Sequence, residues 1–106
     1  MILVIGHVTA RADTIDELQR LSIEHVLRSR AEPGCISHEV ARDAQEPLRL
    51  TFVERWADRQ ALQAHVQLEA SRRFGKALAL GAAQAPEMSV YLSEPLELAA
   101  LLDRPR

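Results

Sequence analysis

Residues 2–9 form a run whose composition dictates much of the architecture. Both alternating sets of side chains are mainly apolar: Ile2, Val4, Gly6 and Val8 in one set, and Leu3, Ile5, His7 and Thr9 in the other. Successive side chains of a strand point to opposite faces of its sheet, so this strand needs a cover on both faces. The run lacks a basic flank and a cleavage site of small residues, and it is therefore predicted to be a strand and not a signal peptide.

The pattern beyond this strand predicts alternating helices and strands. A helix is expected to begin at Thr14, because Thr14 and Glu17 have the spacing of a capping box, and to end at about Arg30, before the Pro-Gly pair at 33–34. Asp58 is the expected N-cap of a second helix. The other predicted elements are strands at 36–42, 48–56 and 88–93, helical segments to about 68 and at 71–80, a weakly helical tail at 96–102, and a fraying end at 103–106.

This β-α-β-β-α-β order is that of a ferredoxin-like α+β fold, in which helices cover one face of a four-stranded antiparallel sheet. Residues 1–106 are interpreted as a single domain, with a core at about 1–94 and a tail at 95–106. The helices leave the second face of the sheet open, although the strand at 2–9 is apolar on both faces. A second copy packed sheet against sheet is the expected cover, so the protein is predicted to be a homodimer.

Composition argues against several classes of partner. The formal net charge is −2 with acidic and basic residues interspersed, which disfavours nucleic-acid binding. No stretch of the sequence approaches the ~20 apolar residues of a membrane span. Cys35 is the single cysteine, so neither an intramolecular disulfide nor a thiolate cluster is expected, and a reducing, cytoplasmic compartment fits. The cysteine is interpreted as small buried packing.

The four histidines are the candidates for chemistry. A helical period places His25 and His65 on the inward faces of their helices, so both point toward the sheet and can line a pocket beneath the helices. His7 lies on the first strand, on a face that the sequence does not decide, and His38 lies on the second. Histidine suits proton transfer near neutral pH. The alternative is that each inward histidine is a core residue bonded to a backbone carbonyl.

A metal site is not expected from the spacing of these histidines. Zinc ligands usually include a close pair on one element, whereas the four histidines lie on four different elements. Glu54 instead needs a partner of its own if it is buried, and Arg55 points to the opposite face, so His38 across the hairpin is the expected partner. The side chains expected to fill the core and to contact a ligand in the pocket are Phe74, Trp56, Leu62 and Leu78.

Three segments together carry a family resemblance. They are Glu32-Pro33-Gly34-Cys35-Ile36-Ser37-His38, Phe52-Val53-Glu54-Arg55-Trp56 and Ala61-Leu62-Gln63-Ala64-His65. In this combination the chain resembles the antibiotic biosynthesis monooxygenase domain, and most closely its quinol-monooxygenase-type members. The resemblance covers nearly the whole chain and implies a ferredoxin-like protomer in a dimeric α+β barrel.

The resemblance also implies a reaction, namely oxidation of a small electron-rich aromatic such as a quinol by O₂, with neither metal nor flavin. His65 is then the expected base, with His25 and His7 for orientation or proton relay. A sister branch that degrades heme is disfavoured, because its Asn, Trp and His positions are not matched here. Two other functions stay open: a non-catalytic dimer that binds a small hydrophobic molecule as a sensor or carrier, and an isomerase or lyase of the same fold.

Overall fold

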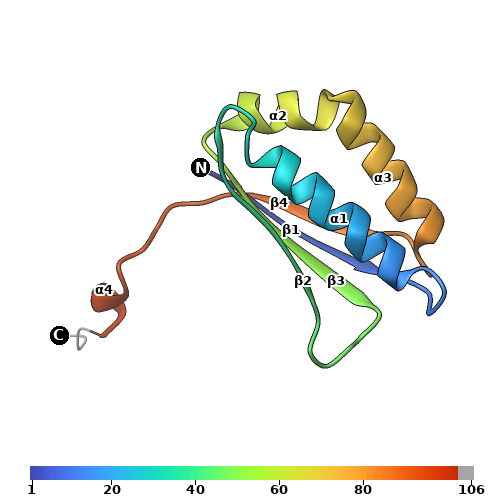
Figure 1. Ribbon diagram of the computed structural model, residues 1–106. Helices are drawn as coiled ribbons and strands as arrows, with labels where there is room; N and C mark the ends of the chain where they lie inside the picture. The colour runs from blue at the N-terminus through green and yellow to red at the C-terminus, as the bar shows by residue number, and fades with distance from the viewer. Residues whose placement is uncertain (103–106) are drawn as a thin grey trace.

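An antiparallel sheet with helices on one face organises residues 1–102, the part of the chain that the computed structural model describes (Figure 1). The elements run in the order β1 (Ile2–Thr9), α1 (Ile15–Ser29), β2 (Cys35–Arg42), β3 (Arg49–Trp56), α2 (Arg59–Gln67), α3 (Glu69–Gly81), β4 (Glu87–Leu92) and α4 (Leu98–Leu102). The strands lie in the order β2-β3-β1-β4, with every neighbouring pair antiparallel. This confirms the ferredoxin-like α+β fold.

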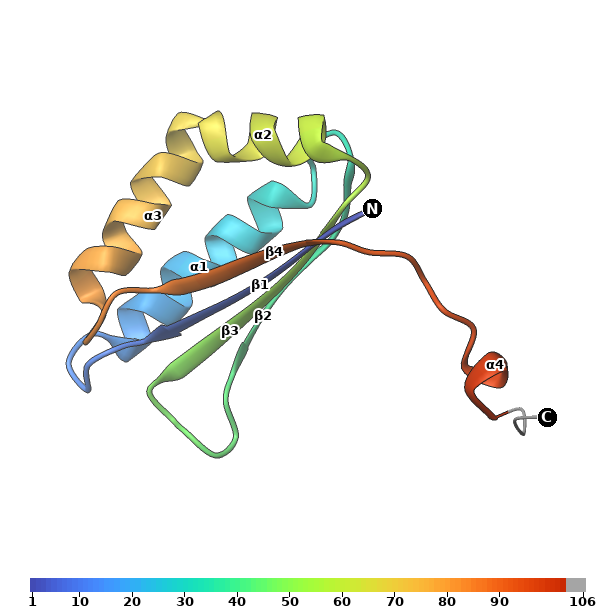
Figure 2. The same cartoon turned by 180° about the vertical axis from the view of Figure 1, so that it is seen from behind.

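The helices α1, α2 and α3 all lie on one side of the sheet (Figures 1 and 2). Exposure alternates along β1: Ile2, Val4 and Val8 are buried, whereas the intervening side chains are only half-buried. The buried set faces the helices, so His7 lies on the other face, where its Nδ1 is 3.2 Å from the hydroxyl of Thr51. One apolar face of β1 therefore has no cover within the described part of a single chain.

The N-terminal ends of α1 and α2 differ from each other. Asp58 caps α2 as predicted, since its Oδ1 accepts a hydrogen bond of 2.9 Å from the backbone N–H of Ala61. The predicted capping box of α1 does not form. The Thr14 hydroxyl instead donates to the carbonyl of Gly81 at 2.6 Å and accepts from the N–H of Arg11 at 3.0 Å. Thr14 thereby connects the start of α1 to the end of α3.

Gly34 fixes the turn between α1 and β2. Its φ is +79°, in the left-handed region where side chains are disfavoured. A Cβ at this position would also overlap the Cβ of Ala61 on α2. The glycine therefore allows the turn that follows α1 to pack directly against α2.

Two apolar clusters fill the space between helices and sheet. The larger one is built on Val8, Ile15, Leu18, Leu50, Phe52 and Leu78, and the smaller one on Ile2, Val4 and Trp56. Along β3 they are separated by Glu54, which is buried on the same side as Phe52 and Trp56. A polar layer thus divides the core into two parts.

The segment after β4 projects away from the body of the domain (Figure 1). Its short helix α4 exposes Leu98, Leu101 and Leu102, each to more than 60%. The predicted helical tail is therefore confirmed at 98–102, and the predicted fraying at 103–106 falls outside the described residues. None of the helices described between residues 1 and 102 is long and apolar enough to cross a membrane.

Candidate active site

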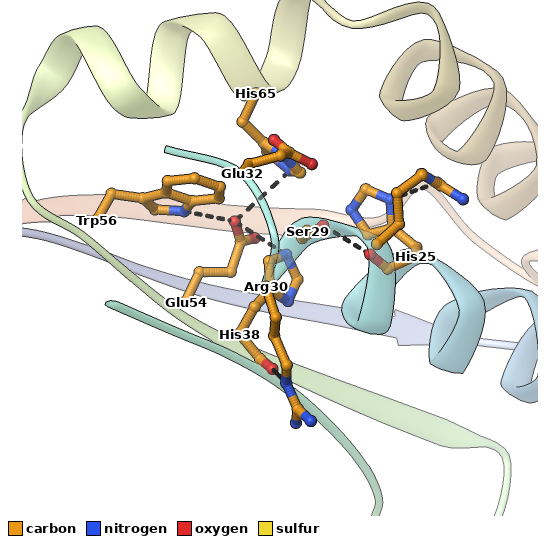
Figure 3. A network of polar contacts seen from close by, with 9 residues as sticks. His25, Ser29, Arg30, Glu32, His38, Glu54, Trp56 and His65 are labelled. Atoms are coloured by element: carbon orange, nitrogen blue, oxygen red, sulfur yellow. Dashed lines mark hydrogen bonds and ion pairs between the residues drawn. The ribbon is translucent and has the colours of Figure 1, made fainter. Parts of the chain in front are cut away.

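Three buried histidines meet in the polar layer between the two apolar clusters (Figure 3). His25 comes from α1, His38 from β2 and His65 from α2, and each is at most 5% exposed. Their ring centroids are 5.1 to 5.6 Å apart. The structure thus brings together His25 and His65, as the helical period predicts, and adds His38. It leaves His7 on the opposite face of the sheet, away from this cluster.

Local structure directs these side chains inward. On α1 the buried side chains include Leu18, Ser22, His25 and Ser29. The two serine hydroxyls donate to backbone carbonyls four residues earlier, at 2.6 Å each. These short, internally satisfied side chains let α1 approach the sheet closely. On β2, His38 pairs with Glu54 in the register of β3, so both side chains point to the helices.

His65 is held by a carboxylate. Its Nδ1 lies 2.8 Å from Oε1 of Glu32, in the segment that follows α1. A carboxylate only accepts hydrogen bonds, so Nδ1 carries the proton and, in the neutral ring, Nε2 carries the lone pair. Nε2 faces the interior, 3.9 Å from Oε1 of Glu54. The ring also packs on Trp56 at a centroid distance of 4.6 Å. His65 therefore has the arrangement of an oriented base.

His25 has the complementary arrangement. Its Nδ1 lies 3.1 Å from Nη2 of Arg28, and a guanidinium only donates, so the proton of the neutral ring is on Nε2. Figure 3 shows Nε2 turned toward the cluster. The ring stacks on Phe74 at 4.1 Å. Burial, followed by the charges of His38, His65 and Arg28, lowers the pKa of His25 to about 3. This ring is therefore neutral at pH 7 and offers a hydrogen-bond donor.

Glu54 connects the histidines to Trp56. Its Oε1 accepts a hydrogen bond of 2.9 Å from the indole N–H, and Nε2 of His38 lies 3.2 Å away, within ion-pair distance but not aligned as a hydrogen bond. Burial raises the pKa of the Glu54 carboxyl, but the contacts with His38 and Trp56 outweigh it, and the pKa falls below its ordinary value. Glu54 is therefore a buried carboxylate at neutral pH.

A cavity of about 140 Å³ adjoins this cluster. Its wall consists of His25, His38, Phe52, Glu54, Leu62, His65, Val66, Ser71, Phe74, Gly75, Leu78 and Met88. Of the four residues expected to contact a ligand, Phe74, Leu62 and Leu78 line the cavity. Trp56 does not line it, because it lies behind Glu54 and His65. A cavity of about 150 Å³ is large enough for benzene, so this one accommodates a single aromatic ring.

A wider groove of about 600 Å³ lies at the far end of the sheet, beside His7. Its lining consists of His7, Thr9, 45–49, 84–85 and Glu87, none of which is buried. Such an open surface does not exclude water from a bound molecule. The smaller cavity, whose wall includes buried side chains, is therefore the better candidate for a reaction.

Periodicity and spacing identify neither Glu32 nor Arg28 as part of the site, although Glu32 opens one of the segments that carry the family resemblance. Glu32 lies 33 positions before His65 and reaches it only because the turn at Gly34 packs on α2. Arg28, three residues after His25, has the ordinary appearance of a surface residue near the end of a helix. Their roles follow only from the packing of the turn and of the cluster.

The fold and the site define a class: a small ferredoxin-like domain with a partly open cavity and an oriented histidine. Comparison with known sequences makes this more specific. The sequence model of the antibiotic biosynthesis monooxygenase family matches residues 1–77, and the chain belongs to this family. A curated relative, an uncharacterized protein from Synechocystis sp., is 38% identical over 66 residues. That match covers 62% of this chain and 45% of the relative, so this chain spans less than half of it.

Solved structures show the same fold. An antibiotic biosynthesis monooxygenase crystal structure is similar with a TM-score of 0.82 and 27% identity, over 90% of this chain and 100% of that chain. A putative antibiotic biosynthesis monooxygenase from Deinococcus radiodurans gives a TM-score of 0.86 at 22% identity, over 92% of this chain and 96% of that one. At this lower identity the similarity shows the fold alone.

Proposed function

We propose that this protein is a monooxygenase that oxidises a small, single-ring phenol or hydroquinone with O₂, without metal or flavin. One observation carries the proposal: Glu32 holds Nδ1 of His65, so that Nε2 faces a cavity large enough for one aromatic ring. Membership of the antibiotic biosynthesis monooxygenase family supports the reaction class. The proposal applies to this cavity and not to the groove beside His7.

The proposed reaction starts with proton transfer. Nε2 of His65 takes the proton of a substrate hydroxyl, and Glu32 and Glu54 stabilise the imidazolium that forms. The resulting phenolate is electron-rich and transfers one electron to O₂. The two radicals then combine to form a C–O bond. The His65 imidazolium then protonates the outer peroxide oxygen. Loss of the ring proton from the oxygenated carbon and cleavage of the O–O bond release water and leave a carbonyl group. A hydroquinone plus O₂ thus gives a hydroxyquinone plus water, and the substrate supplies all four electrons.

Other side chains of the cavity have parts in this scheme. The Nε2–H of neutral His25 faces the cluster and can donate to the phenolate oxygen. The hydroxyl of Ser71 lines the cavity and has no hydrogen-bond partner within residues 1–102, so it is available to a second hydroxyl of the substrate. Apolar side chains such as Phe74 and Leu62 exclude water from the phenolate.

Oxygen uptake by metal-stripped protein over a panel of single-ring hydroquinones tests this proposal. The wild type should exceed the autoxidation blank, and His65→Gln should lower the rate by about 10²-fold or more, the usual contribution of a general base. Glu69→Gln is a control for an unrelated substitution outside the cavity: within residues 1–102 Glu69 pairs with Arg73 on the exposed side of α3, so the rate should be unchanged. Uptake at the blank rate for every substrate, or a His65→Gln variant as fast as the wild type, contradicts the proposal.

A second function is favoured by the apolar wall of the cavity. Phe52, Leu62, Phe74 and Leu78 give it the lining of a site that binds an aromatic molecule without reacting with it, as a sensor or carrier does. In that case the same hydroquinones bind, but none of them stimulates O₂ uptake. His65→Gln then changes affinity only.

We also propose that the protein works as a homodimer in which a second copy covers the open face of the sheet. That face carries Leu3, Ile5, Val53 and Tyr91, the last of them 50% exposed. The projecting leucines of α4 supply further apolar contact for the second copy. Size-exclusion chromatography with light scattering tests this: the wild type should have twice the chain mass, and Ile5→Glu should have the mass of a monomer. Ile23→Glu, on the exposed side of α1, is the matched control and should stay dimeric.

A further inference from the structure

The ring nitrogens of His38 are buried without hydrogen bonds in the described part of the chain. Its ring is 1% exposed, and neither of its nitrogens has a hydrogen-bond partner within residues 1–102. Buried polar atoms are normally bonded, because an unmade hydrogen bond in the interior costs the full desolvation of the group. In the proposed reaction His38 has no part, since His65 is the base and His25 the donor. The ring therefore points to a ligand that the reaction does not account for.

The surroundings of His38 identify the chemistry of that ligand. His25, His38 and His65 each offer one ring nitrogen, and these three atoms lie within 4.8 Å of one another. Oε1 of Glu54 lies 3.2 Å from His38 and 3.9 Å from His65. We infer that this cluster binds one divalent transition-metal ion of the zinc type, with three imidazoles and the Glu54 carboxylate as its ligands.

The donor set selects this class of ion. Three imidazole nitrogens and one carboxylate suit Zn²⁺, Ni²⁺, Cu²⁺ or Fe²⁺, whereas Ca²⁺ and Mg²⁺ require oxygen ligands. Zn–N bonds of about 2.0–2.1 Å put tetrahedral ligands roughly 3.3 Å apart, so the nitrogens need to draw together by up to about 1.5 Å. Side-chain rotation on three separate elements has to supply this movement, and while Arg28 holds His25 the adjoining cavity leaves room for a water molecule in its place on the ion.

The surrounding residues act on the ligands in opposite directions. Glu32 accepts from Nδ1 of His65, which is the carboxylate–histidine–metal arrangement that orients a ligand and strengthens it. Arg28 donates to Nδ1 of His25 and keeps the proton on Nε2, so His25 can bind through Nε2 only after this contact is released. His38, His65 and Glu54 are therefore the primary ligands, and removal of Arg28 should strengthen binding.

Metal binding has a consequence for catalysis, and this part rests on the proposed function. An ion on Nε2 of His65 occupies the lone pair that the substrate proton needs. A redox-inert ion such as Zn²⁺ should therefore compete with the phenol and stop oxygen uptake. The site is then a metal-responsive switch on a reaction that itself needs no metal.

Calorimetric titration of metal-stripped protein with Zn²⁺ alone tests the site, with no substrate present. We expect one ion per chain, an affinity at least about 100-fold lower in His38→Gln, and an affinity about 10- to 100-fold lower in Glu32→Gln. Arg28→Gln should bind more tightly. His7→Gln is the control for adventitious surface binding, and its affinity should equal that of the wild type.

The inference is overturned if the wild type does not bind Zn²⁺, or if the wild type and His38→Gln bind it with equal affinity. Loss of binding in His7→Gln overturns it as well, because the ion would then be on the open face. If His38→Gln does not fold, two other measurements test the site. Glu32→Gln should bind Zn²⁺ more weakly than the wild type, and Zn²⁺ should raise the melting temperature of the wild type. Because binding is measured without substrate, the metal site and the oxygenase reaction can fail separately. Metal-stripped protein that is inactive until Fe²⁺ is added would retain the site and refute the metal-free reaction.

Discussion

Gly34→Ala is the substitution whose cost the structure specifies most fully. The backbone at Gly34 has a φ of +79°, and holding alanine in this left-handed region costs about 1–2 kcal/mol. The added methyl group also overlaps the Cβ of Ala61, and overpacking of this kind costs about 1–3 kcal/mol. The expected loss is therefore about 2–5 kcal/mol, a large part of the roughly 5–15 kcal/mol by which a domain is stable.

A second substitution separates the two terms. Ala61→Gly removes the methyl group that Gly34→Ala meets, while it costs about 1 kcal/mol on its own as a glycine in a helix. The overpacking cost should disappear in the double variant, so the coupling energy between the two sites should be about 1–3 kcal/mol. The cost of holding alanine in the left-handed backbone conformation should remain. Gly75→Ala is the matched control, because nothing lies within 4 Å of an added Cβ in this helix. It should stabilise the protein by about 0.5–1 kcal/mol.

Urea unfolding followed by the fluorescence of Trp56, the single tryptophan, measures all four variants. Trp56 is fully buried beside Glu54 and His65, so its emission reports loss of the core. A Gly34→Ala variant as stable as the wild type would rule out both contributions. If Ala61→Gly does not rescue any of the loss, the steric contribution is absent, since the turn would then not depend on close packing against α2.

The remaining predictions concern the site. The folded pKa of His25 is about 3, below that of an exposed histidine, so the unfolded chain takes up the proton first as pH falls. The free energy of unfolding of the metal-stripped protein should be constant above about pH 6.5 and should fall toward pH 3, by up to about 1.4 kcal/mol per pH unit. Urea unfolding midpoints measured against pH should fall less steeply in His25→Gln. Glu32→Gln should lower the oxygen-uptake rate by about tenfold or more and shift its pH profile, because the amide no longer fixes the Nδ1–H tautomer; an unchanged profile contradicts that role. His7→Gln should keep the wild-type rate, and a loss would return His7 to the reaction.

Periodicity was sufficient to predict the order of elements and most of their ends. The alternation in β1 and the inward positions of His25 and His65 depend on local geometry, which is why the sequence predicts them. The Glu54–His38 contact was also accessible, because a hairpin places the two residues opposite each other. The sequence does not predict which face of the sheet His7 lies on, because the packing of the whole domain decides which side the helices occupy.

Other features depend on contacts between distant segments. The capping box at Thr14 does not form because the Thr14 oxygen, which would accept from the backbone N–H of Glu17, accepts from that of Arg11 instead, while its hydrogen is donated to the Gly81 carbonyl, 67 residues later. The spacing argument against a metal considered pairs on one element, whereas packing brings His25, His38 and His65 together from three elements. Both arrangements depend on contacts between segments that are distant in sequence, which a local pattern does not contain.

The most direct test of the central claim, that the cavity beneath the helices is where the substrate binds, is NMR of the histidine rings during an anaerobic titration with a single-ring hydroquinone. Without O₂ the complex does not react, and the chain has only four histidines to assign. The ring signals of His25 and His65 should shift with saturation, while that of His7 should stay in place. Shifts confined to His7, or none at saturating hydroquinone, would contradict it.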